Sequence, residues 1–441
     1  MSDDFGRGGA RGEARGPADP SLPEASVPRP RPRLAAMAGL IALTLLPVAS
    51  AAQERTTPRV TFDAFGTLGV VHTTEDRADF VWNPSRPDGP GFSEEVSPDP
   101  DSRLGGQITL TVTPELTAVV QVVAEQDSDD DYDPDVEWAN VRYAVTPDLS
   151  VRVGRFALPG FLVSEYRKVS YANTWVRPPV EVYGLIPVFS VDGVEASYRF
   201  HAGDWTTTLS ASLGSSEADL PGAGPVESEN TWNVNGTFQR GHLTGRLAIA
   251  RGELDIDAFD TFFDAFRAFG PAGDDVADRW EVDDTPFEFA TLGAEYAPGG
   301  WIGMAELAWV DFNSVLGEKA AGYVTGGRRL GPVTPYATYS RVELLTDTPV
   351  PGLSLAGLPP ASMGAAAGLN AGLNGILEGM PVQQNVSVGG RWDVLRGMAV
   401  TLQVDFVDRL DASPGTFVNA QTGFERGGSA RLFSLATSFV F

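Results

Sequence analysis

The feature that most constrains the fold is a two-residue alternation of apolar and polar side chains, which recurs in segments of about ten residues between Val60 and Phe441. The clearest example is segment 400–406, VTLQVDF, in which even-numbered positions are apolar and odd-numbered positions are polar. Because successive side chains of a β-strand point to opposite faces, each segment predicts a strand with one apolar and one polar face. About ten residues is also the length that a tilted strand needs to cross a bilayer.

These segments predict sixteen strands, at residues 60–72, 103–113, 116–126, 136–146, 148–156, 190–200, 204–214, 229–240, 242–252, 287–297, 300–311, 319–329, 332–344, 382–393, 397–408 and 430–441. The connections alternate between tight turns rich in Gly, Pro and Asp and longer polar loops. We expect the long loops at 73–102, 127–135, 157–191, 215–228, 253–286, 312–318, 345–381 and 409–430. This rhythm predicts an all-β fold, a transmembrane antiparallel barrel with short turns at one rim and long loops at the other.

The N-terminal residues have the layout of a secretory signal peptide. The apolar stretch 37–49, MAGLIALTLLPVA, follows three arginines and precedes the small residues Ala49-Ser50-Ala51. About 13 apolar residues are too few for a membrane-spanning helix. We therefore expect residues 1–52 to be a signal peptide and leader that is removed, and residues 53–441 to form a single barrel domain.

Composition argues against several classes of function. The net charge of −26 disfavours binding to nucleic acid, because such a surface repels phosphate backbones. The absence of cysteine excludes disulfides and thiol chemistry, and the three histidines, His72, His201 and His242, are far apart in sequence. We expect no catalytic residues, no cofactor and no metal centre, and hence no enzyme.

The last ten residues, LFSLATSFVF, form an alternating strand that ends in Phe439 and Phe441. This ending resembles the C-terminal signature of Gram-negative outer-membrane barrels, which implies that the two aromatic residues form an assembly signal read by the barrel-assembly machinery. The segment 151–156, VRVGRF, followed by a long loop, resembles the region of Gram-negative porins where the third outer loop folds into the barrel.

The resemblance to porins covers most of the residues after the leader, and it is one of architecture. It implies a 16-stranded general-porin-like barrel in the cell outer membrane, with periplasmic turns, extracellular loops and a homotrimeric assembly. It also implies contacts with outer-membrane lipids and lipopolysaccharide, and passive diffusion of ions and small hydrophilic solutes through a water-filled channel. The direction of ion selectivity stays open, because the acidic balance and the arginines on the polar strand faces point in opposite directions.

We expect the third long loop to narrow the channel, since selectivity arises where charged side chains face one another across little water. The loop cations are expected to meet the loop carboxylates near this eyelet, opposite arginines of the wall. The predicted constriction residues are Arg142, Arg152, Glu165, Arg167, Lys168, Arg177 and Glu181.

Three other segments bear on function. The acidic stretch 127–135, DSDDDYDPD, has carboxylates at alternate positions, which leaves open a loose calcium site or a solvated loop tip. The stretch 255–270 predicts a short amphipathic helix over the barrel mouth, and 352–379 predicts a partly helical or flexible loop.

Two alternatives remain open at this stage. A barrel can anchor an outer-membrane enzyme or adhesin without transporting anything, and His72 is the one histidine expected near the outer rim. A soluble exported all-β binding protein would show the same alternation, but strand length and the terminal phenylalanine argue against it.

Overall fold

The computed structural model describes residues 57–441, so the predicted signal peptide and leader lie outside the described residues. Sixteen antiparallel strands form a closed barrel, in which each strand pairs with its neighbours along the chain and the last pairs with the first. They are β1 (Arg59–Thr73), β4 (Arg103–Thr111), β5 (Leu116–Glu125), β6 (Asp135–Ala144), β7 (Leu149–Ala157), β8 (Ser190–Ala202), β9 (Trp205–Leu220), β10 (Gly224–Arg240), β11 (Leu243–Asp255), β12 (Thr285–Tyr296), β13 (Trp301–Asp311), β14 (Glu318–Arg328), β15 (Val333–Leu344), β16 (Gln383–Leu395), β17 (Met398–Arg409) and β19 (Ser429–Val440).

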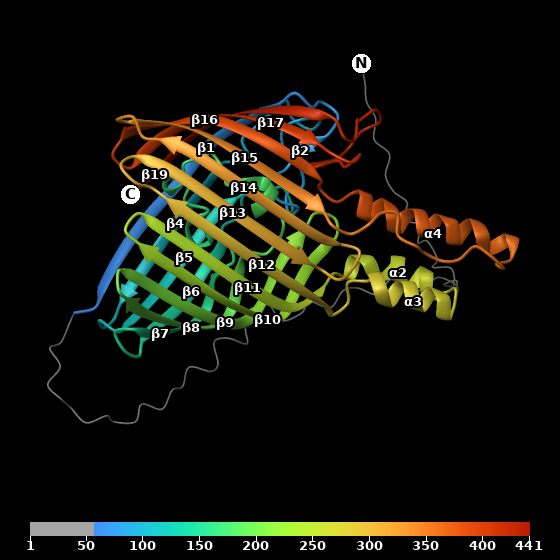
Figure 1. The fold of residues 1–441 in the computed structure, drawn as a ribbon, viewed down its shortest axis with the longest axis horizontal. Coiled ribbons are helices and arrows are strands. Elements are labelled where there is room, and N and C mark those ends of the chain that lie inside the picture. Colours follow the sequence, from blue (N-terminus) through green and yellow to red (C-terminus); the bar gives the residue numbers. More distant parts are fainter. Residues whose placement is uncertain (1–56) are drawn as a thin grey trace, which may run out of the picture. The chain divides into compact units, whose positions relative to one another are not determined.

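Closure depends on the first and last strands. β1 pairs with β19 from Phe65↔Val440 to Thr73↔Leu432, and Ala64 exchanges two backbone hydrogen bonds with Phe441. A closed sheet leaves no strand edge unpaired, which is a condition for a sheet inside hydrocarbon. The predicted strand number, order and antiparallel pairing are confirmed, and Figure 1 shows the tilted strands around the barrel.

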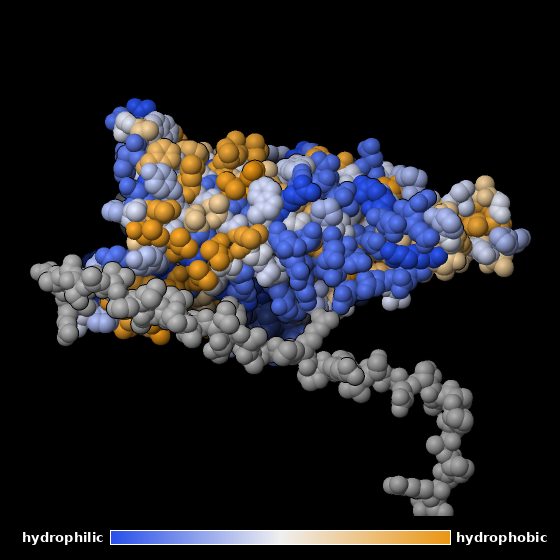
Figure 2. All heavy atoms as spheres, turned by 90° about the horizontal axis from the view of Figure 1, so that it is seen from below, coloured by the Kyte–Doolittle hydropathy of each residue, from blue (hydrophilic) through white to orange (hydrophobic). Residues whose placement is uncertain are grey.

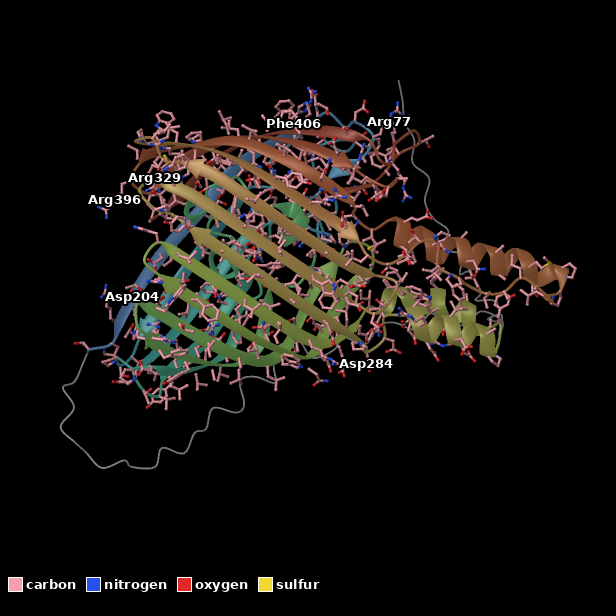
Figure 3. The ribbon with its side chains drawn as sticks, in the orientation of Figure 1. Arg77, Asp204, Asp284, Arg329, Arg396 and Phe406 are labelled. Carbon is pink, nitrogen blue, oxygen red and sulfur yellow. The ribbon has the colours of Figure 1, made fainter. Side chains whose placement is uncertain are left out.

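The apolar faces of the strands point outward. Leu68, Ile108, Leu213, Leu307 and Leu402 are each at least 44% exposed, which a soluble protein would not tolerate in a continuous belt. On the face shown in Figure 2, apolar side chains gather toward the short-turn end, and polar side chains dominate toward the long-loop end. Figure 3 places Asp204, Arg329 and Arg396 at the short-turn rim, and Arg77 and Asp284 at the long-loop rim. No helix of the described residues is long and apolar enough to cross a bilayer.

One predicted loop is wrong. The sequence predicted a long loop at 215–228, but β9 and β10 continue as a paired hairpin, with Glu217 opposite Glu227, and only residues 221–223 connect them. The error has a physical reason. In this hairpin Leu220 and Val226 pack in the interior cluster, while Glu217 and Glu227 pair on the other face. The outward apolar face that marks the other strands is therefore lost.

Several of the other long loops contain strands and helices of their own. The first loop contains β2 (Asp79–Phe80) and β3 (Val96–Ser97), and β2 pairs with β18 (Phe417–Val418) of the last loop. The stretch 255–270, expected to hold one helix, contributes η4 (Asp257–Phe259) and α2 (Asp260–Arg267), and α3 (Pro271–Trp280) follows. The seventh loop holds α4 (Pro360–Glu378), and these helices project beyond the barrel in Figure 1.

Candidate functional site: the loop inside the barrel

The third long loop, residues 158–189, lies inside the barrel, as the sequence predicted. It contains η2 (Ser164–Tyr166), η3 (Ser170–Ala172) and the helical turn α1 (Val180–Tyr183). Glu306 of β13 accepts hydrogen bonds from the backbone N–H of Leu162 at 2.7 Å and from the Tyr183 hydroxyl at 2.9 Å. The Trp175 indole N–H lies 3.0 Å from both Thr325 of β14 and Thr338 of β15. The loop is therefore fixed against the wall by side chains of many strands.

Glu165 ties the loop to β11. The Arg246 guanidinium donates to both Glu165 oxygens, at 2.7 and 2.5 Å, and also to the Phe161 carbonyl oxygen at 2.8 Å. Burial works against ionisation of Glu165, but the hydrogen bonds and charge of Arg246 outweigh it and lower the Glu165 pKa. This bidentate contact fixes the position of Glu165 and keeps its carboxylate ionised.

Lys168, three residues further along, ties the loop to the opposite side. Its ammonium lies 2.9 Å from Glu125 of β5 and 2.5 Å from Glu137 of β6. The neighbouring Arg167 is buried with its guanidinium 3.6 Å from the centre of the Phe189 ring and 3.5 Å from Glu137. Segment 165–168 thus crosses the lumen between β11 and the β5–β6 wall.

The wall between these two attachment points is polar. Arg142 of β6 and Arg152 of β7 are paired in register, and Arg152 donates to Glu195 of β8 at 2.9 Å. Arg142 lies on the lumen face, opposite Thr117 of β5, and its side chain is exposed. Ser212 of β9 and Asn233 of β10 complete this face. The inner strand face between the two attachment points is therefore polar, with Arg142 exposed and Glu195, Ser212 and Asn233 at 8%, 7% and 1% exposure.

Arg177 and Glu181 lie elsewhere, buried against the wall. Arg177 donates to both oxygens of Asp101, at 2.8 and 2.5 Å, to Ser434 at 2.7 Å and to Asp405 at 3.4 Å. Glu181 accepts from Ser340 at 2.7 Å and from Gln383 at 2.6 Å. Burial raises the Glu181 pKa, and these two hydrogen bonds only partly offset it.

The structure therefore separates the seven predicted constriction residues into two groups. Arg142 is exposed and Arg152, Glu165 and Lys168 are partly buried, whereas Arg167, Arg177 and Glu181 are 7%, 6% and 2% exposed and face protein. The expected pairing of loop cations with Glu165 and Glu181 is not found in the described part of the chain. Glu165 and the loop cations have partners of opposite charge outside loop 3, and Glu181 accepts hydrogen bonds from the neutral Ser340 and Gln383. Sequence reasoning missed the wall partners, which are Asp101, Glu125, Glu137, Glu195, Glu306 and Asp405.

Two polar hollows lie beside loop 3. The outer hollow, of about 210 Å³, is lined by the acids Glu125, Asp127, Asp133, Asp135, Glu137, Glu217 and Asp219, together with Arg86, Arg167 and Lys168. A second hollow, of about 350 Å³, lies on the other side of loop 3, where Tyr171 and Asn173 face Arg329, Arg391 and Asp393. The outer entrance is thus mainly acidic, whereas the inner one carries two arginines and one carboxylate.

The structure also places the acidic stretch 127–135 and His72, which the sequence analysis singled out. The Asp127 carboxylate accepts the backbone N–H groups of Asp129 and Asp131, both at 2.9 Å, so it stabilises its own loop. The His72 ring lies against Phe433 on the outer barrel face, and its Nδ1 is 2.7 Å from the Glu95 carbonyl oxygen.

Comparison with known proteins agrees with this architecture at the level of the fold. No protein-family model and no curated protein matches the chain. The outer-membrane channel DcaP of Acinetobacter baumannii is similar with a TM-score of 0.52 and 11% identity, over 89% of this chain and 100% of that one. OmpF of Salmonella typhi, in complex with daunomycin, is similar with a TM-score of 0.51 and 11% identity, over 87% of this chain and 97% of that one. An anion-selective porin from Comamonas acidovorans has a TM-score of 0.49 and 12% identity, over 87% and 100%.

The barrel, the outward apolar belt and these likenesses define the class as a transmembrane β-barrel. Within that class, the chain has the closed 16-stranded fold of general porins.

Proposed function

We propose that the chain is an outer-membrane porin of a Gram-negative bacterium, a water-filled channel for passive diffusion of ions and small hydrophilic solutes, and not an enzyme. The observation that supports this proposal best is the exposed, lumen-facing side chain of Arg142, on the polar inner face of β6 and β7. An exposed charge inside a closed barrel requires water around it. The two polar hollows on either side of loop 3 supply the entrances of the same path.

Selectivity follows from the order of charges along this path. In this proposal, solutes entering from the long-loop rim pass the acidic outer hollow, which Lys168 lines, and then Arg152 and Arg142, which pair near the short turn between β6 and β7. Arg152, Glu165 and Lys168 each form an ion pair. Arg142 forms none with the described residues, so its positive charge is not neutralised by a neighbouring carboxylate. Wide acidic entrances concentrate cations, whereas an unneutralised arginine along the path disfavours them.

Planar-bilayer recording of the purified protein in a salt gradient tests the proposal. We expect stable single-channel steps, and we expect Arg142→Ala to change the reversal potential. Arg240→Ala is a matched control, because Arg240 lies in the short-turn rim, where it pairs with exposed Asp204 and lies over the Trp205 ring. A protein that inserts but never conducts would contradict the proposal.

A second candidate rests on a different observation. Helices α2, α3 and α4 project from the long-loop rim, and Phe263, Phe266 and Leu373 pack there into one apolar cluster. Such a projection suits a barrel-anchored adhesin. Inserted protein without conductance that still binds to host surfaces, and loses that binding when 360–378 is deleted, would favour this alternative.

Assembly belongs to the same proposal. We propose a homotrimer in a membrane of lipids and lipopolysaccharide, delivered by a cleaved signal peptide and inserted by the barrel-assembly machinery. Phe441 is 82% exposed and contacts Phe439 at a ring-centroid distance of 5.6 Å, so both rings are available to a recognising partner. Light scattering of the detergent-solubilised protein, corrected for bound detergent, measures the number of chains.

A further inference from the structure

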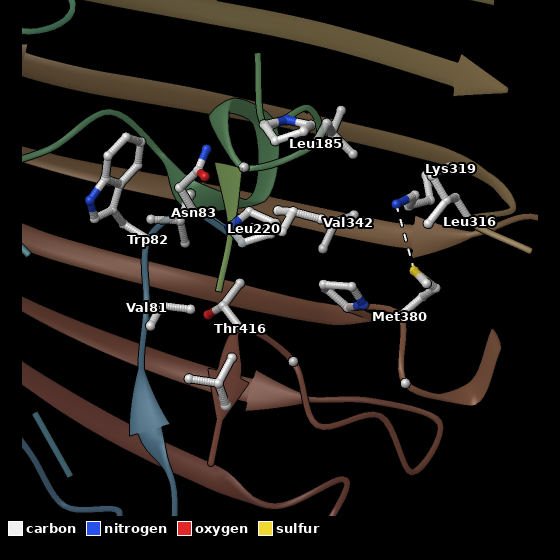
Figure 4. A pocket seen from close by; sticks show the side chains of 18 of the residues that line it. Val81, Trp82, Asn83, Leu185, Leu220, Leu316, Lys319, Val342, Met380 and Thr416 are labelled. Atoms are coloured by element: carbon white, nitrogen blue, oxygen red, sulfur yellow. Dashed lines mark hydrogen bonds between the residues drawn. The ribbon is translucent and has the colours of Figure 1, made fainter. Parts of the chain in front are cut away.

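An apolar cavity of about 270 Å³ lies beneath the long-loop rim, next to the acidic outer hollow, with which it shares Trp82, Asn83 and Pro187 in its lining. Its wall side comes from β14 and β15, through Lys319 and Val342. Its other sides come from loop segments that are distant in sequence, namely 81–84, 184–187, 379–381 and 415–418. Figure 4 shows these segments around one space, with Leu185, Leu220, Leu316 and Val342 among the side chains that line it.

The cavity surface is almost entirely hydrocarbon. Leu185, Val226, Leu254, Ile256, Phe312 and Val342 are all no more than 5% exposed and present aliphatic or aromatic groups to it. Glu181 also lines the space, but Ser340 and Gln383 occupy its two oxygens. A space of this kind suits the apolar body of a ligand.

Lys319 is the exception. It is only 8% exposed, and its Nζ lies 3.8 Å from the Met380 sulfur and 5.1 Å from the centre of the Phe312 ring. Within the described residues no carboxylate forms an ion pair with it, whereas the other lysine of the barrel, Lys168, has two. An ammonium offers three donors, and a thioether is a weak acceptor. Its charge and most of its hydrogen-bonding capacity are therefore unmatched within an apolar site.

We propose that this cavity binds an amphipathic monocarboxylate, whose carboxylate pairs with Lys319 and whose apolar body lies against Leu185 and Val342. One cation defines one anionic position, and Glu181 on the same cavity surface disfavours a second negative charge on the ligand. Fatty acids and apolar aromatic acids share this chemistry. Binding at this site does not depend on whether the polar path conducts.

Decanoate is a suitable probe, because it combines ten carbons with one carboxylate. Equilibrium dialysis of labelled decanoate against the purified full barrel in lipid nanodiscs, with empty nanodiscs subtracted, gives the dissociation constant. 1-Decanol and decyltrimethylammonium are the uncharged and cationic comparators. We expect decanoate to bind more tightly than 1-decanol, and the cationic amphiphile not to compete for the site.

Two variants locate the site. Lys319→Met keeps the length and apolar volume of the side chain, and should weaken decanoate binding by about ten- to a hundredfold while leaving 1-decanol binding unchanged. Val342→Phe fills the cavity and should weaken both. Arg240→Met removes a rim charge and should change neither.

Equal affinities of the unaltered protein for decanoate and 1-decanol would overturn the proposal, as would decanoate binding that survives both Lys319→Met and Val342→Phe. Aromatic monocarboxylates such as naphthoate, tested in the same assay, distinguish between an aliphatic and an aromatic ligand. Because dialysis measures binding without conductance, a negative result here leaves the channel proposal untouched, and a barrel that fails to conduct leaves this site testable.

Discussion

Replacing Arg177 by methionine tests whether loop 3 is held in the barrel by buried charge. Arg177 is 6% exposed and lies between Asp101 at 1% and Asp405 at 4% side-chain exposure. Removing the guanidinium leaves two carboxylates buried without a cation. Losing one partner of a buried ion pair costs about 3–5 kcal/mol, because the remaining charge is neither solvated nor paired. We therefore expect Arg177→Met to lower the free energy of unfolding by about this amount.

Urea unfolding in lipid vesicles, followed by tryptophan fluorescence, measures this change. The matched comparison adds Asp101→Asn and Asp405→Asn to Arg177→Met, which removes the carboxylate charges together with the guanidinium. This triple variant should recover most of the loss. A single variant within about 0.5 kcal/mol of the unaltered protein would refute the reasoning, because that is the usual effect of a surface substitution. A triple variant that is no more stable than the single one would refute it equally.

Four other changes have defined outcomes. Arg142→Glu should shift the reversal potential toward cation preference, with a smaller shift in 1 M salt, where screening reaches about 3 Å; equal shifts at both salt concentrations would contradict this. Changing Asp127, Asp133 and Asp135 together to asparagine should lower the cation-to-anion permeability ratio; an unchanged ratio would place the acidic hollow off the ion path. Since burial raises the Glu181 pKa above 4.5, its ionisation costs stability as pH rises from that value, so Glu181→Gln should gain stability over the unaltered protein at neutral pH but not at pH 4. Phe441→Ser should reduce the amount of barrel assembled in cells without changing refolding in detergent; unchanged cellular levels would argue against an assembly signal.

Much of the barrel is predictable because lipid and lumen impose opposite demands on successive residues of one strand. Leu402 and Gln403 show this: the first is 61% exposed to the membrane side, and the second hydrogen-bonds inside the barrel. The same rule explains the failure at 215–228. In this hairpin the outward face carries Glu217 and Glu227 and the inward face carries Val226, so Ser215 to Ser228 pair as strands without an outward apolar face to reveal them.

The candidate site was less predictable, since its contacts join residues that only the closed barrel brings together. Loop 3 was identified from its position after β7 and from its resemblance to porins. Which strand meets which loop charge depends on register and tilt around sixteen strands, and pairs such as Arg177–Asp405 span 228 residues. The site around Lys319 was unpredictable for the same reason. The sequence predicted its strand, but not the apolar loop segments, distant in sequence, that surround its side chain.

The apolar cluster inside the barrel bears directly on whether water can pass, because a uniformly dry interior would exclude a channel. Lumen-facing positions differ around the circumference. From β11 to β15 they include Ala250, Phe289, Ala308, Tyr323 and Tyr336, which pack with loop 3 into one cluster. From β4 to β10 many of the corresponding positions are polar, among them Gln107, Gln121, Arg142, Arg152, Glu195, Ser212 and Asn233, although Phe156, Val191 and Val226 belong to the apolar cluster. Loop 3 thus has much of its apolar packing against β11 to β15 and polar contacts with other strands. In the proposed channel, solutes pass along the polar positions, and the rigidity of the apolar packing fixes the width of their path.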